Sequence, residues 1–477
     1  MVSSQAAQLA VQIGSTAVLA RILYPSDFGL VAMVTSVIAF GNAFRELGLG
    51  TATIQKAEIS DDFVSALFWV NVSIGMTLTL IMMACAPLVA WIFREPALQP
   101  IMIYLSAGIA IGSMGTQHLA LMHRKMLFVH AEIVKISGIF VAAIAAITVA
   151  VLGGTYWALV VNSLAAATLT VIGLWIVCRW IPGRPRKVKG LMQSIRFGMH
   201  VTGFDIINYF SRNLDRILIG RFAGAEALGF YSRAYTLMML PVSNLRVPLS
   251  TVGLPAMSRL QNNPDRFRAY YIKYTALLAF VSMPIVAYMF VYADEIVRIL
   301  LGSKWEKTGE IFRILAAAAF LQPVASLIGL VLMASGDSKR YFQLGLLYAV
   351  CITSAFVAGI PWGVRGVAFS YAVANYILLG PALIFSFRRS VVRPTDFFRA
   401  TYRPAIASLV AAVCTWIAIP VLDWGHMIFL LIGGFVVYCA AYLIFWALLP
   451  GGRRDMLQYI SYIYPNSGRR AGTTDGV

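Results

Sequence analysis

The residues with the most chemical capacity in this sequence lie inside apolar stretches. The densest group combines carboxylates, an amide and guanidinium groups: Asp205, Asn208, Arg212, Asp215 and Arg216. Steps of three and four residues put all of these except Asp215 on one helical face. Guanidinium groups stay charged and hold phosphate or carboxylate in two places. The group therefore predicts a surface that binds an anion, or else an internal ion-pair network in which Asp215 reaches Arg212.

A second polar face lies near the start of the chain. Gln5, Gln8 and Gln12 recur at steps of three and four residues in an apolar segment. If they line a cavity, these neutral amides suit the hydroxyl groups of a sugar; otherwise they suit hydrogen bonds to a neighbouring helix. We favour the cavity.

Further cations are candidates to line the same cavity, which would be the lumen of the protein: Arg45, Lys135, Arg233 and Arg246. Arg45 follows Asn42 near the end of its segment, so we favour a position at the membrane surface, with the charge reaching water. Lys135 has Glu132 one turn earlier, and both a lumen contact and an internal pair would explain it. The same two interpretations stay open for Arg233 and Arg246.

Regularly spaced prolines follow in the same region of the chain: Pro241, Pro248 and Pro255. Each removes a backbone hydrogen bond on one face, so the helix is expected to bend there. The bend is a candidate gating hinge, although a static kink is the favoured interpretation.

The cysteines and histidines point away from metal and redox chemistry. The sequence has five of each, all standing singly without CxxC spacing or Cys/His pairs. That spacing argues against a metal site or a disulfide framework, and we expect no metal and no cofactor. A membrane polymerase or glycosyltransferase would need catalytic carboxylates or histidines on a sizeable loop, and the sequence has no such loop. We therefore expect a protein that is not an enzyme.

The composition indicates where these polar residues must lie. Apolar residues make up 60% of the chain, charged residues make up 12%, and the mean hydropathy is +0.78. A soluble protein needs about 25% charged residues to cover its surface. An all-α integral membrane protein is therefore predicted. The net charge of +18 fits basic cytoplasmic loops, and no nucleic-acid partner is expected.

Apolar segments long enough to cross a bilayer recur along the whole chain. We predict about 14 transmembrane helices, since a span takes about 20 mostly apolar residues. The segments are 4–24, 28–51, 63–93, 99–122, 130–152, 155–179, 196–221, 228–256, 270–292, 310–334, 341–361, 364–387, 402–422 and 427–449. The longest breaks, at 181–195 and 293–309, are too short for a folded soluble domain.

Basic residues predict the orientation in the membrane. Breaks rich in Lys and Arg, such as 179–189 and 388–403, alternate with breaks that contain few. Cytoplasmic loops carry the excess of Lys and Arg, so both termini are predicted to be cytoplasmic. The N-terminus has no basic region followed by a small-residue cleavage site, and no signal peptide is expected.

The sequence also repeats itself weakly. Residues 19–30 match residues 219–230 without a gap, with Gly29 at the position of Gly229, and residues 154–159 echo residues 363–368. Such a repeat predicts two parallel lobes around a central site. The expected division is an N-lobe of six helices at 1–180, a cytoplasmic linker at 181–195, a C-lobe of six helices at 196–387, two extra helices at 388–449, and a cytoplasmic tail at 450–477.

Two stretches carry a resemblance to a known family. Residues 19–33 read LARILYPSDFGLVAM and residues 44–55 read FRELGLGTATIQ, which resembles the opening of bacterial polysaccharide transporters. Residues 213–221, NLDRILIGR, with LGFY at 228–231, resemble the junction of the seventh and eighth helices in the same family. These transporters are the flippases of O-antigen and exopolysaccharide repeat units in the multidrug/oligosaccharidyl-lipid/polysaccharide (MOP) exporter superfamily.

The resemblance implies a V-shaped pair of lobes, as in MATE transporters, that open alternately to either side of the bacterial inner membrane. The implied substrate is an undecaprenyl-diphosphate-linked oligosaccharide, used for lipopolysaccharide or exopolysaccharide biosynthesis, whose lipid tail stays in the bilayer. Membrane lipid and other polysaccharide assembly proteins are the expected partners.

The alternatives are a multidrug or organic-cation antiporter, a lipid II flippase of the same superfamily, and a membrane polysaccharide polymerase. An antiporter for cations would want an excess of carboxylates inside the spans, whereas here Arg and Lys outnumber them.

Overall fold

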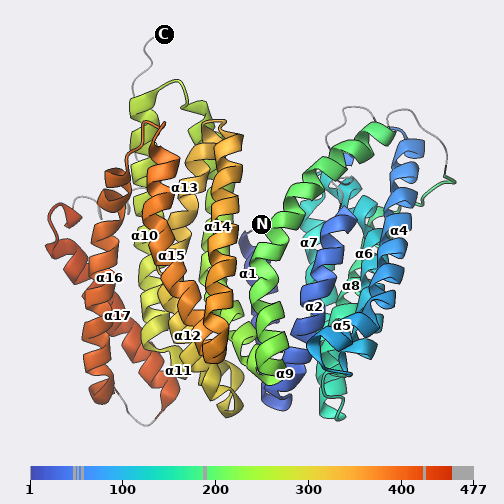
Figure 1. The fold of residues 1–477 in the computed structure, drawn as a ribbon, viewed down its shortest axis with the longest axis horizontal. Helices are drawn as coiled ribbons and strands as arrows, with labels where there is room; N and C mark the ends of the chain where they lie inside the picture. The colour runs from blue at the N-terminus through green and yellow to red at the C-terminus, as the bar shows by residue number, and fades with distance from the viewer. Residues whose placement is uncertain are drawn as a thin grey trace. The chain divides into compact units, whose positions relative to one another are not determined.

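The computed structural model describes residues 2–46, 50, 53–54, 59–185, 191–422 and 426–453. Side chains are described within these ranges except at residues 2, 3, 43, 44, 46, 191–212, 244–252 and 422. In this part of the chain every regular element is a helix (Figure 1). Helices are what an apolar chain forms in hydrocarbon, because each backbone N–H and C=O is then satisfied within its own segment.

The helices follow one another with short connections. The first half contains α1 (Val2–Ile22), α2 (Pro25–Glu46), α4 (Asp61–Ala84), α5 (Ala86–Phe93), α6 (Leu98–Arg124), α7 (Phe128–Val151), α8 (Trp157–Cys178) and α9 (Leu191–Arg259). The second half contains α10 (Pro264–Val291), α11 (Ala293–Leu301), the 3-10 helix η1 (Ser303–Trp305), α12 (Glu306–Ala319), α13 (Gln322–Ala334), α14 (Ser338–Gly359), the 3-10 helix η2 (Ile360–Trp362), α15 (Gly363–Phe387), α16 (Pro394–Leu422) and α17 (Met427–Leu448).

Each predicted segment overlaps a helix, and the differences lie at breaks inside segments. The predicted span 63–93 is divided into α4 and α5 at Cys85, just before Pro87 in the first turn of α5. The predicted span 310–334 is divided into α12 and α13 just before Pro323. Proline starts a helix readily but cannot continue one without losing a hydrogen bond. The predicted break at 293–309 is itself helical, since it holds α11 and η1.

Many helices are long and apolar enough to cross a membrane. Nine helical stretches in the described residues meet that condition by length and composition. The number of spans in the whole chain stays a prediction.

The chain divides into two compact units, each described by itself. Unit 1 comprises Met1–Thr236, Val297–Ile311 and Leu347–Tyr371, and unit 2 comprises Leu237–Ile296, Phe312–Leu346 and Ala372–Val477. Part of the second half of the chain thus belongs to unit 1. The lobe boundaries predicted from the internal repeat stay a prediction.

Unit 1 is a bundle of helices packed side by side. α4 lies on α6, both α6 and α7 lie on α8, and α1 lies on α7. A buried hydroxyl connects the first pair, because Thr79 Oγ1 donates to the Ser106 carbonyl at 3.1 Å and accepts from the Ala110 N–H at 3.1 Å. Hydrogen bonds of this kind join helices where apolar contact alone gives little preference over lipid.

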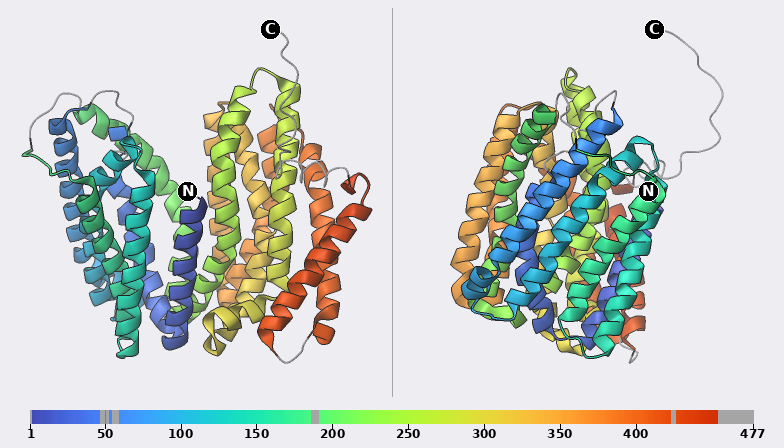
Figure 2. Two further views of the ribbon diagram at one scale, coloured as in Figure 1. Left: turned by 180° about the vertical axis from the view of Figure 1, so that it is seen from behind. Right: turned by 90° about the vertical axis from the view of Figure 1, so that its right-hand side faces the viewer.

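Unit 2 is built around α10, which packs against α13, α16 and α17. Figure 2 shows α16 and α17, coloured red, side by side. The Tyr442 hydroxyl of α17 donates to the Phe280 carbonyl of α10 at 3.0 Å. Arg268 of α10 holds Asp396 of α16 through two hydrogen bonds of 2.8 and 2.7 Å. These contacts join helices that are more than a hundred residues apart in sequence.

Candidate functional site: a cationic pocket in unit 1

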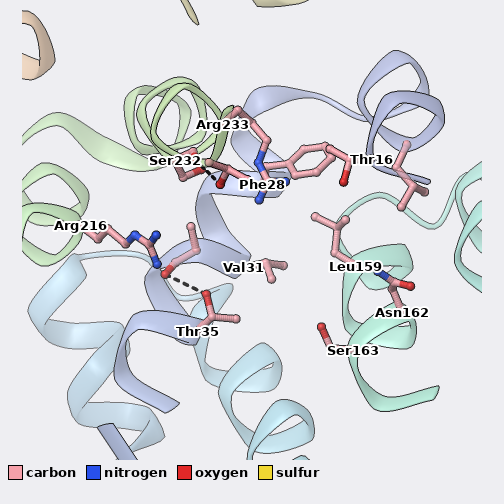
Figure 3. A pocket seen from close by; sticks show the side chains of 13 residues that line it. Thr16, Phe28, Val31, Thr35, Leu159, Asn162, Ser163, Arg216, Ser232 and Arg233 are labelled. Atoms are coloured by element: carbon pink, nitrogen blue, oxygen red, sulfur yellow. Dashed lines mark hydrogen bonds between the residues drawn. The ribbon is translucent and has the colours of Figure 1, made fainter. Parts of the chain in front are cut away.

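A pocket with a volume of about 240 Å³ lies among α1, α2, α8 and α9, and all of its lining residues belong to unit 1 (Figure 3). Its lining is Thr16, Leu19, Phe28, Val31, Ala32, Thr35, Leu159, Asn162, Ser163, Arg216, Ser232, Arg233 and Thr236. Figure 3 shows Arg216 and Arg233 on one side of this space and Asn162 and Ser163 on another. The lining therefore combines two cations with several neutral hydrogen-bonding groups.

One break in α9 brings the two arginines to the same pocket. Gly224 has φ 85° and ψ 178°, a conformation that glycine adopts without steric cost, and it separates α9 into two arms. Arg216 lies on the first arm and Arg233 on the second. The predicted helices 196–221 and 228–256 are these two arms.

Aromatic rings accompany both guanidinium groups. Arg216 lies over the ring of Tyr235, with 5.7 Å between the guanidinium carbon and the ring centroid. Arg233 lies over the ring of Phe28 at 4.7 Å. Contacts of this kind stabilise a cation by about 0.5–2 kcal/mol. They hold the side chains in place while leaving their N–H groups able to donate to a ligand.

Neither guanidinium forms an ion pair with a carboxylate whose side chain the structure describes. The Nε atoms of Arg216 and Arg233 are buried and lack a hydrogen-bond partner. A buried N–H without a hydrogen-bond partner is costly, and such groups in proteins are normally paired. The geometry thus fits an anion that arrives from outside the chain.

Asp215 does not line the pocket, although it is next to Arg216 in the sequence. Its side chain is only 1% exposed, and it accepts from the Tyr231 hydroxyl at 2.8 Å and from the Arg216 backbone N–H at 2.8 Å. The bond from Tyr231 connects the two arms of α9. The partner expected from the sequence, Arg212, has a side chain outside the described residues.

Neutral polar groups complete the pocket. The Thr35 hydroxyl donates to the Ala32 carbonyl at 3.2 Å, and the Thr236 hydroxyl donates to the Ser232 carbonyl at 2.7 Å. Each hydroxyl keeps acceptor lone pairs after donating its one hydrogen. Asn162 and Ser163 add an amide and a hydroxyl from α8. Such groups suit the hydroxyls of a sugar.

Of the site residues predicted from the sequence, the structure brings Arg216 and Arg233 together. Gln5, Gln12 and Lys135 are exposed and Gln8 is half-buried, and none of these lines the pocket. Arg45 is half-buried and lies against Gly112 of α6. The side chains of Asp205, Asn208, Arg212 and Arg246 lie outside the described residues, so their roles stay predictions.

The predicted proline hinge also stays a prediction. The backbone of α9 is helical at Pro241, Pro248 and Pro255, whereas its non-helical position is Gly224. The side chain of Pro248 is outside the described set.

Several residues that line the pocket were not predicted from the sequence. Phe28 and Thr35 come from one stretch and Asn162 and Ser163 from another, and only the adjacent pair Asn162-Ser163 gave a signal, as polar residues inside an apolar segment. Among residues that the structure describes, no group of three or more His, Cys, Asp or Glu side chains gathers as a metal site would require.

The fold and the pocket together define a multi-pass, all-helical membrane protein with a cationic pocket among its helices. The chain belongs to the family described as "Polysaccharide biosynthesis protein", which matches residues 18–310. This confirms the resemblance drawn from residues 19–55 and 213–231.

Bacterial relatives match over most of their length. The lipopolysaccharide biosynthesis protein WzxC of Escherichia coli (strain K12) is 24% identical over 390 residues, which cover 79% of this chain and 78% of WzxC. The succinoglycan biosynthesis transport protein ExoT of Rhizobium meliloti (strain 1021) is 24% identical over 402 residues, covering 83% and 80%.

Solved structures share the fold. The lipid II flippase MurJ in an inward closed conformation superposes with a TM-score of 0.76 at 14% identity, covering 96% of this chain and all of MurJ. An inward-facing multidrug resistance MATE family transporter of the MOP superfamily gives a TM-score of 0.66 at 14% identity, covering 80% and 94%. The predicted all-α fold of the MOP superfamily is therefore confirmed.

Proposed function

We propose that this protein is a flippase that moves undecaprenyl-diphosphate-linked oligosaccharide repeat units across the bacterial inner membrane by alternating access. The repeat units would serve lipopolysaccharide or exopolysaccharide biosynthesis. The observation that carries the proposal is the pocket in which Arg216 and Arg233 face one space without a described carboxylate partner. Family membership and the transport named for ExoT support it.

The charge of the pocket suits the diphosphate of such a substrate. Guanidinium groups bind phosphate through two hydrogen bonds and remain charged at any physiological pH. The polar head of a lipid-linked sugar does not cross hydrocarbon unaided, since each unsatisfied polar group costs several kcal/mol there. Two arginines and several hydroxyls would replace water around that head.

The size of the pocket limits what it holds. Its volume of about 240 Å³ is below the range of about 300–1,000 Å³ that encloses drug-sized ligands. A diphosphate with part of one sugar fits this space, and a whole repeat unit does not. We therefore assign the pocket to the diphosphate end of the substrate.

The same proposal includes an orientation with both termini in the cytoplasm, supported by the alternation of basic breaks. Single cysteines in a background without native cysteine test it. Impermeant reagents added outside are expected to label Ser303→Cys and Gly425→Cys and to leave Arg186→Cys and Arg393→Cys unlabelled. The reverse pattern would overturn the orientation.

A multidrug or organic-cation antiporter is the second candidate. It would need carboxylates to bind its cations, and the described residues that line the pocket include two arginines and no carboxylate. We also propose a transporter rather than an enzyme, because the described lining of the pocket offers binding groups without a general base or a nucleophile activated by one.

Deleting the gene tests the function. A surface or secreted polysaccharide is expected to disappear, while its lipid-linked repeat unit accumulates on the cytoplasmic face. As the control, a copy of the gene inserted elsewhere in the chromosome should restore the polysaccharide. Normal polysaccharide together with new sensitivity to cationic drugs would instead favour the antiporter.

A further inference from the structure

Unit 2 contains a hollow that is larger than the cationic pocket of unit 1. It has a volume of about 660 Å³, and it is lined by α10, α12, α16 and Tyr376 of α15, all within unit 2. Apart from Arg313 and Tyr376, every described residue of the lining is hydrophobic. The volume is in the range of about 300–1,000 Å³ that encloses small ligands. We call this hollow the groove of unit 2.

Alanines form the floor of the groove, and larger side chains form its walls. The lining residues recur at steps of three and four on α10, α12 and α16, so each helix turns one face to the space. Ala287 of α10 and Ala316 of α12 are buried, and Ala412 of α16 is half-buried. Larger hydrophobic side chains of the lining are exposed beside them, among them Phe290, Leu409 and Trp416. A methyl group at each facing position leaves a channel that a larger side chain would fill.

The length of the groove matches one acyl chain within a leaflet. Along α12 the lining runs from Arg313 to Leu321, just past the end of the helix, which is about 12 Å at a rise of about 1.5 Å per residue. The hydrocarbon of one leaflet is about 15 Å deep, half of about 30 Å. Arg313 lies near the start of the predicted span 310–334. A chain that enters beside Arg313 would therefore extend from the membrane surface to near the midplane.

An ion pair marks the end of the groove near the membrane surface. A guanidinium N–H of Arg313 donates to the Asp294 carboxylate at 2.6 Å, and the two side chains are 42% and 52% exposed. A guanidinium has five N–H donors, and an ionised carboxylate accepts at both oxygens. One hydrogen bond between them leaves both groups able to bind a ligand. This end of the groove thus presents a cation and an anion side by side.

Charges of both signs select the kind of lipid. The phosphate of phosphatidylethanolamine suits the guanidinium of Arg313, which can bind it through two hydrogen bonds. Its ammonium suits the carboxylate of Asp294, because an ammonium donates three hydrogen bonds and accepts none. Phosphatidylglycerol and a polyprenyl diphosphate have no ammonium, and their phosphates would bring negative charge next to Asp294. Like charges in contact disfavour binding, so the zwitterionic headgroup fits best.

The groove is held in shape by contacts within unit 2. The Tyr376 hydroxyl of α15 donates to the Ala317 carbonyl in the last turn of α12 at 2.8 Å. On the other side, α10 packs along α16. A site that is already formed loses less free energy to ordering when its ligand binds. The groove is therefore suited to a lipid that stays bound.

We infer that the groove of unit 2 binds one phosphatidylethanolamine molecule of the membrane, with an acyl chain over the alanines and the headgroup at Arg313 and Asp294. The inference does not rest on the proposed function, since it uses no residue that we assign to the substrate. Surrounding lipid is as apolar as the groove, so the hydrophobic effect adds little to the binding of the chain. The headgroup must supply the selectivity, and selectivity is what separates a bound lipid from a passing one.

Photo-cross-linking of the purified protein in lipid nanodiscs tests the site. A phosphatidylethanolamine with a diazirine in one acyl chain is expected to label the peptides around Ala316 and Ala412. Unlabelled phosphatidylethanolamine should displace it at about one tenth of the concentration that phosphatidylglycerol needs, the ratio that about 1.4 kcal/mol gives. Equal displacement by the two lipids would mean an annular lipid only. Stronger displacement by undecaprenyl diphosphate would assign the groove to the tail of the substrate. Either result would overturn the inference.

Variants separate the headgroup from the chain. Asp294→Asn should keep the labelling and lose the preference for phosphatidylethanolamine, whereas Glu226→Gln, another exposed carboxylate near a cation, should keep the preference. Ala412→Phe should abolish the labelling, and Ala418→Phe, half-buried on α16 outside the lining, should not. An unchanged preference in the Asp294 variant would also overturn the inference.

The competition in the native protein decides the question even where Ala412→Phe does not fold. It is also independent of transport. If the gene deletion leaves polysaccharide normal, the proposed function fails, while the cross-linking still shows whether the groove of unit 2 selects phosphatidylethanolamine.

Discussion

Arginine is used in opposite ways in the two units. In unit 2, Arg268 grips Asp396 through two parallel hydrogen bonds, and Asp396 also accepts from the Arg393 backbone N–H at 2.8 Å. In unit 1, Arg216 and Arg233 lie over aromatic rings, and their Nε atoms have no partner. A paired arginine joins helices, whereas an unpaired buried one keeps its hydrogen-bonding capacity for a ligand. The difference separates structural charges from those that we assign to the substrate.

The largest expected effect is on the unpaired arginines. Replacing both Arg216 and Arg233 by Gln should reduce polysaccharide export by about 100-fold or more, since a hydrogen bond to a charged group is worth about 1.5–3 kcal/mol and two are removed. The amount of protein in the membrane should stay normal. Lys at both positions should restore only part of the export, because it keeps the positive charge but lacks the planar guanidinium that donates two parallel hydrogen bonds.

The matched control for this pair is Arg389→Gln, at an exposed position in unit 2, which should export normally. If the double variant and its Lys counterpart both lost protein to the same degree as export, the two arginines would be structural and the contrast between the units would disappear.

The paired arginine should give the opposite pattern. Asp396→Asn or Arg268→Gln is expected to lower the melting temperature of the purified protein by a few degrees, because one partner of a bidentate pair is left without the other. Export per molecule of folded protein should be unchanged. Combining both changes should cost less than the sum of the single changes. A fully stable single variant that fails to export would assign this pair to the transport path.

A smaller effect is expected for the neutral side of the pocket. Asn162→Ala and Ser163→Ala should each reduce export by about two- to tenfold, as one neutral hydrogen bond contributes about 0.5–1.5 kcal/mol. The reduction should depend on the sugar next to the diphosphate, measured with two different repeat units. Ser370→Ala, whose hydroxyl donates to the Val367 carbonyl of its own helix at 3.1 Å, serves as the comparison. An identical loss with every repeat unit would place these residues at the diphosphate instead.

The smallest effect is expected at the prolines of α9. If the bends at Pro241 and Pro255 are static, changing either proline to Ala should leave export within about twofold. Such a change would alter the local stability of the helix and not a step of transport. A large loss of export without loss of protein would restore the hinge interpretation and weaken the role given to Gly224.

Much of the fold follows from local sequence. Hydropathy over about 20 residues identifies a span, so α4, α6 and α10 lie where the sequence puts them. Prolines at the start of a helix explain the divisions that were missed, because Pro87 and Pro323 sit inside stretches whose hydropathy is uninterrupted. The helical character of 293–309 was missed for the opposite reason: its charged residues read as a break, although α11 packs there as a short helix.

The candidate site could be predicted only in part. Arg216 and Arg233 stood out as cations inside apolar segments, since charge at that depth is costly and usually kept for use. Thr35 and Phe28 gave no signal, because a single threonine or phenylalanine in an apolar helix is ordinary. The glutamines of α1 were expected in the lumen and lie outside the pocket lining.

By itself the sequence determined the class of protein, its helical segments and its repeat, because these depend on the composition of continuous stretches. Tertiary structure decided which polar residues meet. Arg216 and Arg233 converge because Gly224 divides α9 between them, and Asn162 faces them because α8 packs in the same unit. The close approach of Gly29 to the Ala225 carbonyl and of Gly229 to the Pro25 carbonyl likewise depends on how two distant segments meet, which no local pattern of hydropathy records.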